Sequence, residues 1–416
     1  MPTLSRSEKK VLAVLAHRST VIGVSAEVVD NSLDDFLFRL VTYTSGNLLF
    51  LGIIEDVQIR TQYLPPADTK ALSIRNLLCL DAQKQTGPVR DAPSIGTKVS
   101  FASNDDLHSF FPKKEFHGYL GYLRGTNFPL PLDLNKLCFA NTAILAGINH
   151  GKSHLAALLV SQLHLAKKRV LVIDPSGEWT TLANKFKEMI ENSTNEKLSV
   201  RSYVLEELKL ANSYHAVPWE QGDKIIDTFH NNDLTILDIS LTGKSMGAEG
   251  KASLRCEAVY DIQQALMRHA AWKYGKTREP YGLQGCVVLD EAHEFVPHMP
   301  TSDVQKRVSA LFSISTKEYR KYGLGHIFID QSLKAISEDL QIQTFLLGAT
   351  TTPTDIGFLE SSLGSEVASA AQRTIGGVEK PSWVAYGVAT PVNGIPWEIE
   401  TLGPKDISLL LKKQST

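Results

Sequence analysis

The sequence has few cysteines and no surplus of charge of either sign. Its 416 residues include four cysteines, and none forms a C-x-x-C pair, so neither a zinc site nor a disulfide framework is indicated. Scattered thiols are typical of the reducing cytoplasm, where we expect the protein to reside. The net charge of −2 gives no global signature of nucleic-acid binding. Basic residues confined to a few loops would leave that bulk charge unchanged, so DNA binding is not excluded.

Long apolar runs, internal repeats and low-complexity tracts are also missing. No apolar run approaches the roughly 18–20 residues that span a bilayer, so no membrane contact is expected. The N-terminus has a short apolar stretch without a clean signal-peptidase site, and residues 1–17 are therefore predicted to be an amphipathic helix or arm. The length leaves room for two or three domains.

The segment 18–115 has the pattern of short β-strands. Residues 20–30, 36–42 and 48–54 are rich in β-branched and aromatic side chains, and Asn, Asp, Ser and Gly separate them. A small β-barrel is the natural packing for such strands. The proline-containing stretch 63–96 is predicted to be a long excursion or an extra helix within this barrel domain.

The segment 116–400 alternates apolar strands with helices, which predicts an α/β domain with a mainly parallel sheet covered on both faces. Residues 180–230 are polar and are expected to form a partly helical insertion between two core strands, and residues 401–416 a C-terminal tail or brace. The expected strands are 143–146, 169–173, 234–239, 286–289, 326–329 and 345–347, and the expected helices are 152–167, 252–273 and 303–320.

A phosphate-binding loop is predicted at the start of this domain. The sequence Ala146-Gly147-Ile148-Asn149-His150-Gly151-Lys152-Ser153 follows a strand and opens a helix, close to the pattern G-x-x-x-x-G-K-[S/T]. Backbone N–H groups of such a loop bind phosphate oxygens. Lys152 would contact the β- and γ-phosphates of ATP, and Ser153 would bind Mg²⁺. Alanine at the first position requires a negative φ there.

Two adjacent acids end another expected strand. The sequence Cys286-Val-Val-Leu-Asp290-Glu291 runs from apolar residues into carboxylates. Asp290 is predicted to hold Mg²⁺ through its hydration shell, and Glu291 to polarise the attacking water. The alternative is a solvent-exposed acidic turn without a catalytic role. The upstream phosphate loop argues against this alternative, because the two motifs are chemically complementary.

Two further polar elements follow. Strand 326–329 ends in Asp330 and Gln331, and Gln331 is predicted to contact the γ-phosphate or the lytic water. Arg320 and Lys321 lie before this strand, in a basic segment that ends at Gly323. Basic residues suit a helix C-terminus. They also suit an arginine finger that a neighbouring subunit donates to ATP, and the two interpretations are compatible.

Taken in order, these motifs resemble the HerA branch of the HerA/FtsK ATPases over most of the chain. The resemblance implies a RecA-like P-loop ATPase core behind an N-terminal barrel of the HerA–ATP-synthase type, a homo-hexameric ring, and ATP-driven movement on duplex DNA through a central pore. It also implies a NurA-type nuclease or a phage-defence effector as partner, in repair or in defence. The stretches that carry it are 117–120, 129–136, 170–179, 290–297 and 320–332.

The resemblance also extends the set of candidate site residues. Asp174 and Glu178 belong to an element resembling D-x-x-G-E-[Y/F/W], near the nucleotide and the subunit interface. The ATP-contacting set then comprises Gly147, Asn149, His150, Gly151, Lys152, Ser153, His154, Asp174 and Glu178, with Ser153 and Asp290 on Mg²⁺ and Glu291, Gln331, Arg320 and Lys321 in hydrolysis.

The phosphate loop departs from the family pattern G-x-T-G-S-G-K-S. Ala146, Ile148, Asn149 and His150 replace the first glycine, the threonine, the middle glycine and the serine. Asn141 also stands where a histidine is common. The departures keep a second hypothesis open, namely a nucleotide-binding ring scaffold that assembles a partner with little turnover. A motor for conjugation or packaging ranks third, because neither a membrane anchor nor a packaging nuclease is visible.

Candidate DNA contacts are basic residues in Gly-rich or polar segments. Lys244 and Lys251 flank a Gly-rich stretch, and Lys306 and Arg307 follow a second polar stretch. Loops of this kind track phosphates without reading bases, so sequence-independent binding is expected. Ordinary surface loops remain the alternative.

Overall fold

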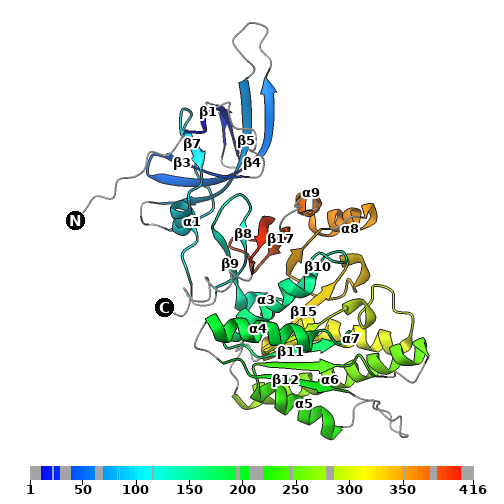
Figure 1. The fold of residues 1–416 in the computed structure, drawn as a ribbon. Helices are drawn as coiled ribbons and strands as arrows, with labels where there is room; N and C mark the ends of the chain where they lie inside the picture. The colour runs from blue at the N-terminus through cyan, green and yellow to red at the C-terminus, as the bar shows by residue number, and fades with distance from the viewer. Residues whose placement is uncertain are drawn as a thin grey trace. The chain divides into compact units, whose positions relative to one another are not determined.

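The computed structural model divides the chain into two units, each described by itself (Figure 1). Unit 1 comprises Met1–Lys114 and Arg124–Phe128, and unit 2 comprises Glu115–Leu123 and Pro129–Thr416. The structure describes residues 11–20, 23–28, 39–60, 69–81, 83, 85–114, 117–193, 197–205, 219–242, 247–277, 285–349, 352–374 and 382–403. Among these residues, no helix has the length and apolar character needed to cross a membrane.

Unit 1 is a closed antiparallel barrel of six strands. Closure comes from β2, which pairs with β1 on one side and with β5 on the other. Buried side chains such as Val41, Tyr43 and Phe50 fill its interior. A short helix α1 (Asn104–Phe110) follows, with Ser103 and Asp106 forming a capping box. The barrel strands are β1 (Ala13–Ser19), β2 (Gly23–Val28), β3 (Leu40–Ser45), β4 (Leu48–Arg60), β5 (Thr69–Leu80) and β7 (Lys98–Phe101), with β6 (Thr86–Gly87) added to the outside of β5.

Two sequence-based expectations for this unit are wrong in part. Residues 13–17 belong to strand β1 rather than to a helix, because Ala13 and Leu15 are buried in the barrel; residues 1–10 lie outside the described part. Residues 69–80 are strand β5 rather than an excursion or helix. Of the prolines that suggested an excursion, Pro65 and Pro66 fall outside the described residues, and Pro88 and Pro93 follow β5 in the chain. Strand β5 instead pairs along its whole length with β4.

Unit 2 is built on an eleven-stranded mixed sheet, counted over the described residues. Its order is β12-β13-β11-β14-β15-β10-β16-β17-β18-β8-β9, and the first seven strands are parallel. The parallel strands are β12 (Val200–Val204), β13 (Leu234–Asp238), β11 (Val170–Asp174), β14 (Gly285–Leu289), β15 (Leu324–Asp330), β10 (Thr142–Leu145) and β16 (Thr344–Leu347). The antiparallel strands are β17 (Ser382–Gly387), β18 (Trp397–Thr401), β8 (His117–Leu123) and β9 (Pro129–Asp133).

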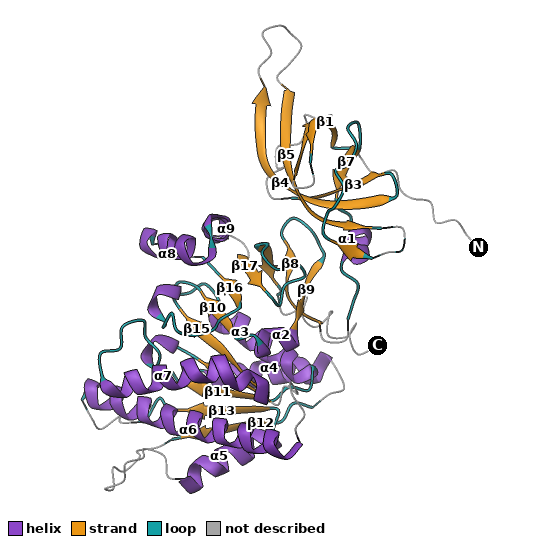
Figure 2. Ribbon diagram, turned by 180° about the vertical axis from the view of Figure 1, so that it is seen from behind, coloured by secondary structure: helices purple, strands orange, loops and turns teal. Residues whose placement is uncertain are grey.

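Helices cover both faces of the parallel strands (Figures 1 and 2). One face carries α3 and α4, and the other carries α5, α6 and α7, whose apolar side chains pack on Leu145, Ile173 and Leu289. The helices are α2 (Leu134–Phe139), α3 (Lys152–Leu165), α4 (Trp179–Ser193), α5 (Trp219–Asn231), α6 (Ala248–Thr277), α7 (Asp303–Glu318), α8 (Pro353–Leu363) and α9 (Ser365–Arg373).

The segment 180–230, which was predicted to be an insertion, contributes helices and a strand to the α/β domain itself. It supplies α4, the strand β12 and α5, and β12 pairs with β13 at the edge of the sheet. Strand β11 pairs directly with β13, and the chain between these two strands includes α4, β12 and α5. The edge strand has little apolar alternation because most of its residues stay partly exposed, which hid it from the sequence pattern. Of the predicted tail 401–416, residues 404–416 lie outside the described part.

A buried polar network joins β10, β15, α6 and α7. The side chain of His326 is fully buried, and its Nδ1 lies 3.2 Å from the Asn141 Oδ1, while its Nε2 lies 3.1 Å from the Gln263 Nε2. Since the Asn141 oxygen can only accept, Nδ1 carries the proton and Nε2 accepts. The Asn141 amide also donates to the Thr316 and Gln341 carbonyls. Burial lowers the pKa of His326 to about 3.

This histidine predicts an acid-sensitive fold. Between its folded pKa of about 3 and its ordinary value of 6.5, the unfolded chain binds a proton that the folded chain does not, so stability falls as pH falls. His326→Gln removes the titration and is expected to flatten the slope by up to about 1.4 kcal/mol per pH unit. Urea unfolding of both proteins at pH 6.5, 5.5 and 4.5 measures this. Parallel pH dependences would contradict the assignment.

Candidate nucleotide site

Most of the predicted site residues lie at the carboxyl ends of the parallel strands, which we call the nucleotide edge of the sheet. In the strand registers, Leu145 of β10 pairs with Asp330 of β15, and Asp174 of β11 pairs with Asp238 of β13. Strand β15 lies between β10 and β14, so the phosphate loop, Asp330 and the Asp290 pair end three neighbouring strands. Neighbouring strands are about 4.8 Å apart, which brings these groups within reach of one small ligand.

The phosphate loop is anchored to neighbouring strand ends. The Ala146 N–H donates to the Asp330 carbonyl at 3.2 Å, and the Gly147 N–H donates to the Ala349 carbonyl at 3.1 Å. The Lys152 ammonium donates to the carbonyls of Ala146 (2.9 Å) and Gly147 (3.4 Å), so it lies over the loop. The loop leads into the N-terminus of α3, where the helix dipole favours a phosphate.

The unusual loop sequence suits the backbone that carries it. Asn149 has φ +64°, in the left-handed region, and asparagine is among the few non-glycine residues that tolerate it. Gly151, the N-cap of α3, also has a positive φ of +78°. Ala146 is not among the described residues with positive φ, so its Cβ causes no backbone strain. Its Cβ instead fills space beside Gly348, where any added Cβ would lie 2.6 Å away.

This geometry predicts opposite results for two substitutions. Asn149→Gly keeps the left-handed conformation and is expected to bind ATP as the unchanged protein does. Asn149→Val places a β-branched residue where φ is +64°. The strain of about 1–2 kcal/mol should weaken ATP binding about tenfold. Titration with a fluorescent ATP analogue measures both. Equal affinities for the two variants would contradict the loop conformation.

Asp290 is a buried carboxyl group held by a tryptophan. Its Oδ2 accepts from the Trp179 indole Nε1–H at 2.8 Å, and its Oδ1 accepts from the Glu291 N–H at 3.0 Å. Burial raises the pKa of Asp290 to about 6, and the bond from Trp179 opposes that rise. At neutral pH the carboxyl is therefore largely ionised, in a place where a cation would offset the cost of its burial.

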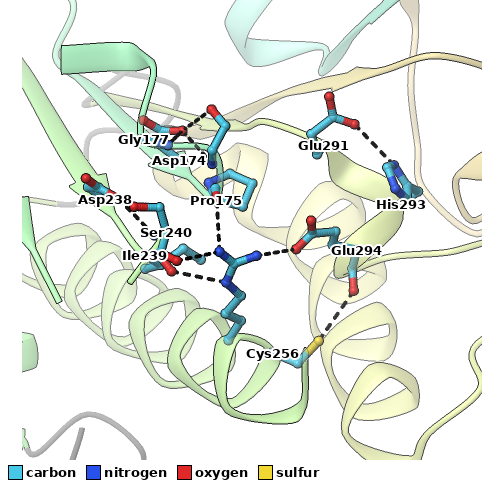
Figure 3. A network of polar contacts seen from close by, with 12 residues as sticks. Asp174, Pro175, Gly177, Asp238, Ile239, Ser240, Cys256, Glu291, His293 and Glu294 are labelled. Atoms are coloured by element: carbon cyan, nitrogen blue, oxygen red, sulfur yellow. Dashed lines mark hydrogen bonds and ion pairs between the residues drawn. The ribbon is translucent and has the colours of Figure 1, made fainter. Parts of the chain in front are cut away.

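Glu291 adopts a backbone conformation that few non-glycine residues take. Its φ is +46°, and such strain persists where the surroundings enforce it. The carboxylate Oε2 lies 3.5 Å from the His293 Nδ1, in an interaction drawn in Figure 3. His293 also contacts the Asp330 Oδ2 through its N–H (2.6 Å) and its Nδ1 (3.0 Å). These contacts raise the pKa of His293, and the bond to Asp330 is the largest cause.

Asp330 organises the centre of this edge. Its carboxylate is buried, and besides His293 it accepts from the Gln331 N–H at 2.7 Å. The Gln331 side chain itself is exposed at the end of β15, next to the phosphate loop strand. Asp330 thus fixes both the loop after β14 and the start of the loop after β15, a role that the sequence did not distinguish.

The turn after β11 is closed by Asp174. Its two carboxylate oxygens accept from the Ser176, Gly177 and Trp179 N–H groups and from the Ser176 hydroxyl, at 2.8–3.0 Å. Asp174 is therefore engaged by its own turn and positions Trp179, which in turn holds Asp290. Glu178 lies in the same turn, and the His154 ring contacts the Phe186 ring of α4 at a tilted angle. Direct contacts of Asp174, Glu178 and His154 with ATP stay predictions.

Arg320 and Lys321 lie at the amino ends of the parallel strands, on the side of the sheet opposite the phosphate loop. They belong to the 3₁₀ turn Tyr319–Tyr322, which leads into the amino end of β15. The Arg320 guanidinium donates to the Gln343 Oε1 at 3.3 Å and lies over the Phe139 ring, and the Lys321 ammonium lies over Tyr322. A seven-residue strand spans about 23 Å, so neither residue reaches the phosphate loop of its own chain.

The DNA candidates are spread over two helices. Lys244 lies outside the described residues, and Lys251 occupies the first turn of α6. Lys306 forms an ion pair with Asp303 at 2.9 Å, and Arg307 forms one with Glu257 at 3.4 Å. Carboxylate partners reduce the local positive charge of the last two, which weakens them as phosphate contacts relative to Lys251.

A Mg²⁺ ion fits the donors present at this edge. Mg²⁺ in nucleotide sites is held by one or two protein oxygens together with phosphates and water. The half-buried Ser153 hydroxyl and the Asp290 carboxylate are such oxygens. The described residues contain no cluster of three or more His, Cys, Asp or Glu side chains that would bind a metal without the nucleotide.

Comparison with known proteins identifies the segment that carries the phosphate loop. The family model of the HerA helicase central domain matches residues 118–241. The central part of this chain is therefore similar to the HerA family. The match includes the phosphate loop and the Asp174 turn, and it ends before Asp290. The resemblance proposed from the motifs is thereby confirmed for this segment.

Individual proteins match parts of this chain. The DNA double-strand break repair helicase HerA of Sulfurisphaera tokodaii is 28% identical over 178 residues, which is 42% of this chain and 30% of that protein. VirB4 of Thermoanaerobacter pseudethanolicus superimposes with a TM-score of 0.43 at 13% identity, over 70% of this chain and 97% of that one. The genome packaging NTPase of Sulfolobus turreted icosahedral virus 2 gives 0.39 at 13% identity, over 64% and 98%.

Proposed function

We propose that this protein is an ATP-hydrolysing motor that translocates on or unwinds duplex DNA. The observation that carries the proposal is the convergence of Lys152, Asp290, Glu291 and Gln331 at the carboxyl ends of three adjacent strands. A RecA-like core is supported by the same order, in which β15 lies between the strands of the phosphate loop and of the acid pair. The match to the HerA central domain supports DNA as the substrate.

Each side chain has a distinct role in this proposal. Lys152 turns from the Ala146 and Gly147 carbonyls to the β- and γ-phosphates of ATP. Ser153 and Asp290 hold the Mg²⁺ of the nucleotide, which would neutralise the charge that develops on the phosphates. Glu291 polarises the attacking water, and Gln331 contacts that water or the γ-phosphate. Asp330, through His293, keeps the loop that bears Glu291 in place.

A ring is proposed because one chain does not complete its own site. Arg320 and Lys321 lie at the edge of the sheet opposite the phosphate loop, so only a second copy can present them to the nucleotide. Head-to-tail contacts of this kind form a ring when the rotation between neighbouring copies closes. We propose a homo-hexamer, the state implied by the HerA resemblance, with duplex DNA in the pore and a NurA-type nuclease or a defence effector as partner.

The nucleotide-binding scaffold remains a second candidate, supported by one observation. Ile148, which stands where the HerA loop has threonine, is 69% exposed on the phosphate loop and offers no hydroxyl to a phosphate. Such a ring would assemble a partner while turning over little ATP. Its oligomers and partner binding would persist in Lys152→Ala. Strong ATP turnover by the purified protein alone would contradict it.

The experiment for the proposed function is ATP hydrolysis measured with and without duplex DNA. The proposal predicts that duplex DNA of unrelated sequences stimulates hydrolysis equally, since no base-reading motif is present, and that Lys251→Ala raises the half-saturating DNA concentration. Negative-stain imaging with ATP and DNA should show sixfold rings with density through the pore. Hydrolysis that is unaffected by any DNA would contradict a DNA motor.

A further inference from the structure

Arg255 is a buried guanidinium that connects three loops of the nucleotide edge. It lies on α6, and its side chain is 9% exposed. Its Nε donates to the Ile239 carbonyl at 3.1 Å, and its Nη2 donates to the Ser240 carbonyl at 2.8 Å and to the Pro175 carbonyl at 2.9 Å. Its Nη1 donates to the Glu294 Oε2 at 3.2 Å. Figure 3 shows these acceptors around one guanidinium.

Two of these contacts lead to the acids of the site. Pro175 belongs to the turn that ends in Trp179, and the Trp179 indole holds the Asp290 carboxylate. Glu294 ends the 3₁₀ turn Ala292–Glu294, whose N-cap is Glu291. The Glu294 N–H donates to the Glu291 carbonyl at 2.9 Å. A single guanidinium therefore restrains both the turn that positions Asp290 and the turn that follows Glu291.

The remaining contacts of Arg255, and helix α6 on which it lies, connect it to Lys251, a candidate DNA contact. Ile239 and Ser240 follow β13, at the start of the connection to α6. Lys251 lies four residues before Arg255, one helical turn away on the same side of α6. A displacement of the first turns of α6 moves the guanidinium, and with it both loops that flank the acids.

We propose that Arg255 is a positioning residue that couples DNA contact at the start of α6 to the placement of Asp290 and Glu291. This inference rests on the proposed function and concerns how DNA binding regulates ATP hydrolysis. A planar guanidinium with fixed donors suits this role because it holds several acceptors in one rigid geometry. Lysine keeps the charge and one contact, and it loses that geometry.

The decisive comparison is the rate of ATP hydrolysis by Arg255→Lys with and without duplex DNA. Basal hydrolysis should fall by less than the DNA-stimulated rate, and the KM for ATP should stay close to that of the unchanged protein. The DNA-stimulated kcat should fall by about fivefold or more, in the usual range of coupling between sites. The half-saturating DNA concentration should not change, since the Arg255 side chain is buried. Arg268→Lys, an exposed arginine on the same helix, is the matched control.

A second variant separates coupling from folding. Glu294→Gln keeps the shape of the partner and removes its charge, so the stimulated kcat should fall in the same direction while thermal unfolding stays close to that of the unchanged protein. Equal losses of basal and stimulated rates, or full stimulation of Arg255→Lys, would overturn the proposal. Absence of stimulation in the unchanged protein would instead overturn the proposed function, so the two failures are distinct.

Discussion

Replacing Glu291 with glutamine is expected to slow ATP hydrolysis by about 10²- to 10⁴-fold while ATP binding persists. The amide keeps the size of the side chain and cannot accept a proton from the attacking water. The Asp290 carboxylate and its bond from Trp179 are untouched by the change, so the nucleotide and Mg²⁺ should still bind. Phosphate release measured at saturating ATP, together with binding of a fluorescent analogue, separates the two effects.

Glu360→Gln is the matched control for this prediction. Glu360 is exposed on α8, and the same change of charge there should leave hydrolysis unaltered. A Glu291→Gln protein that hydrolyses ATP within about twofold of the unchanged protein would remove Glu291 from the mechanism, since general-base roles are worth far more than that.

Lys152→Ala is expected to weaken ATP binding by about 10- to 100-fold and to abolish measurable hydrolysis. The ammonium is the one cation of the phosphate loop, and its present contacts are two loop carbonyls that water can satisfy after the change. Isothermal titration with a non-hydrolysable analogue measures the affinity. Lys185→Ala, at an exposed position on α4, is the control.

The interpretation of Lys152→Ala also separates the two candidate functions. A motor loses its DNA-dependent ATP turnover and any movement on DNA with this change. A scaffold keeps its oligomers and its partner, because assembly would depend on surfaces that the change leaves intact. Unaltered ATP affinity in Lys152→Ala would contradict both, as neither is compatible with a phosphate loop that does not bind through its lysine.

The sequence was sufficient for those parts of the fold that local patterns specify. The apolar strands that lead up to Ala146, Asp290 and Asp330 were predictable, because buried parallel strands are continuous runs of Val, Ile and Leu. The edge strand β12 was not, since its residues are mostly exposed and lack that pattern. Strand β1 was taken for a helix or arm because the short apolar run 11–16 fits both periods.

The candidate site could be predicted where its residues belong to one motif of fixed spacing, and not where several distant segments meet. Lys152 and Glu291 follow motifs of fixed spacing. Arg255 lies 80 residues from Pro175 and 39 from Glu294, so no local spacing signals their contact. Trp179 gave a partial signal, as part of the D-x-x-G-E-W element, while its bond to Asp290 depends on the pairing of β11 with β14.

The position of Arg320 at the amino end of β15 could likewise be determined only from the three-dimensional structure. From sequence, a basic helix end and an arginine finger were both compatible with the segment before β15. The structure gives it a 3₁₀ turn at the amino end of that strand, opposite the phosphate loop. A contribution of Arg320 to hydrolysis must therefore come from a second copy, which makes the oligomer part of the central claim.

The most direct test of that claim mixes two inactive variants. Lys152→Ala lacks a working nucleotide site and can still present Arg320, whereas Arg320→Ala has an intact site and no finger to present. Each alone should hydrolyse little ATP. Mixed in equal amounts and reassembled with duplex DNA, they should recover up to about a quarter of the unchanged rate, because that share of head-to-tail interfaces joins an intact site to an intact Arg320. A mixture that stays as inactive as its components, in rings shown to contain both variants, would contradict a site completed by the neighbouring subunit.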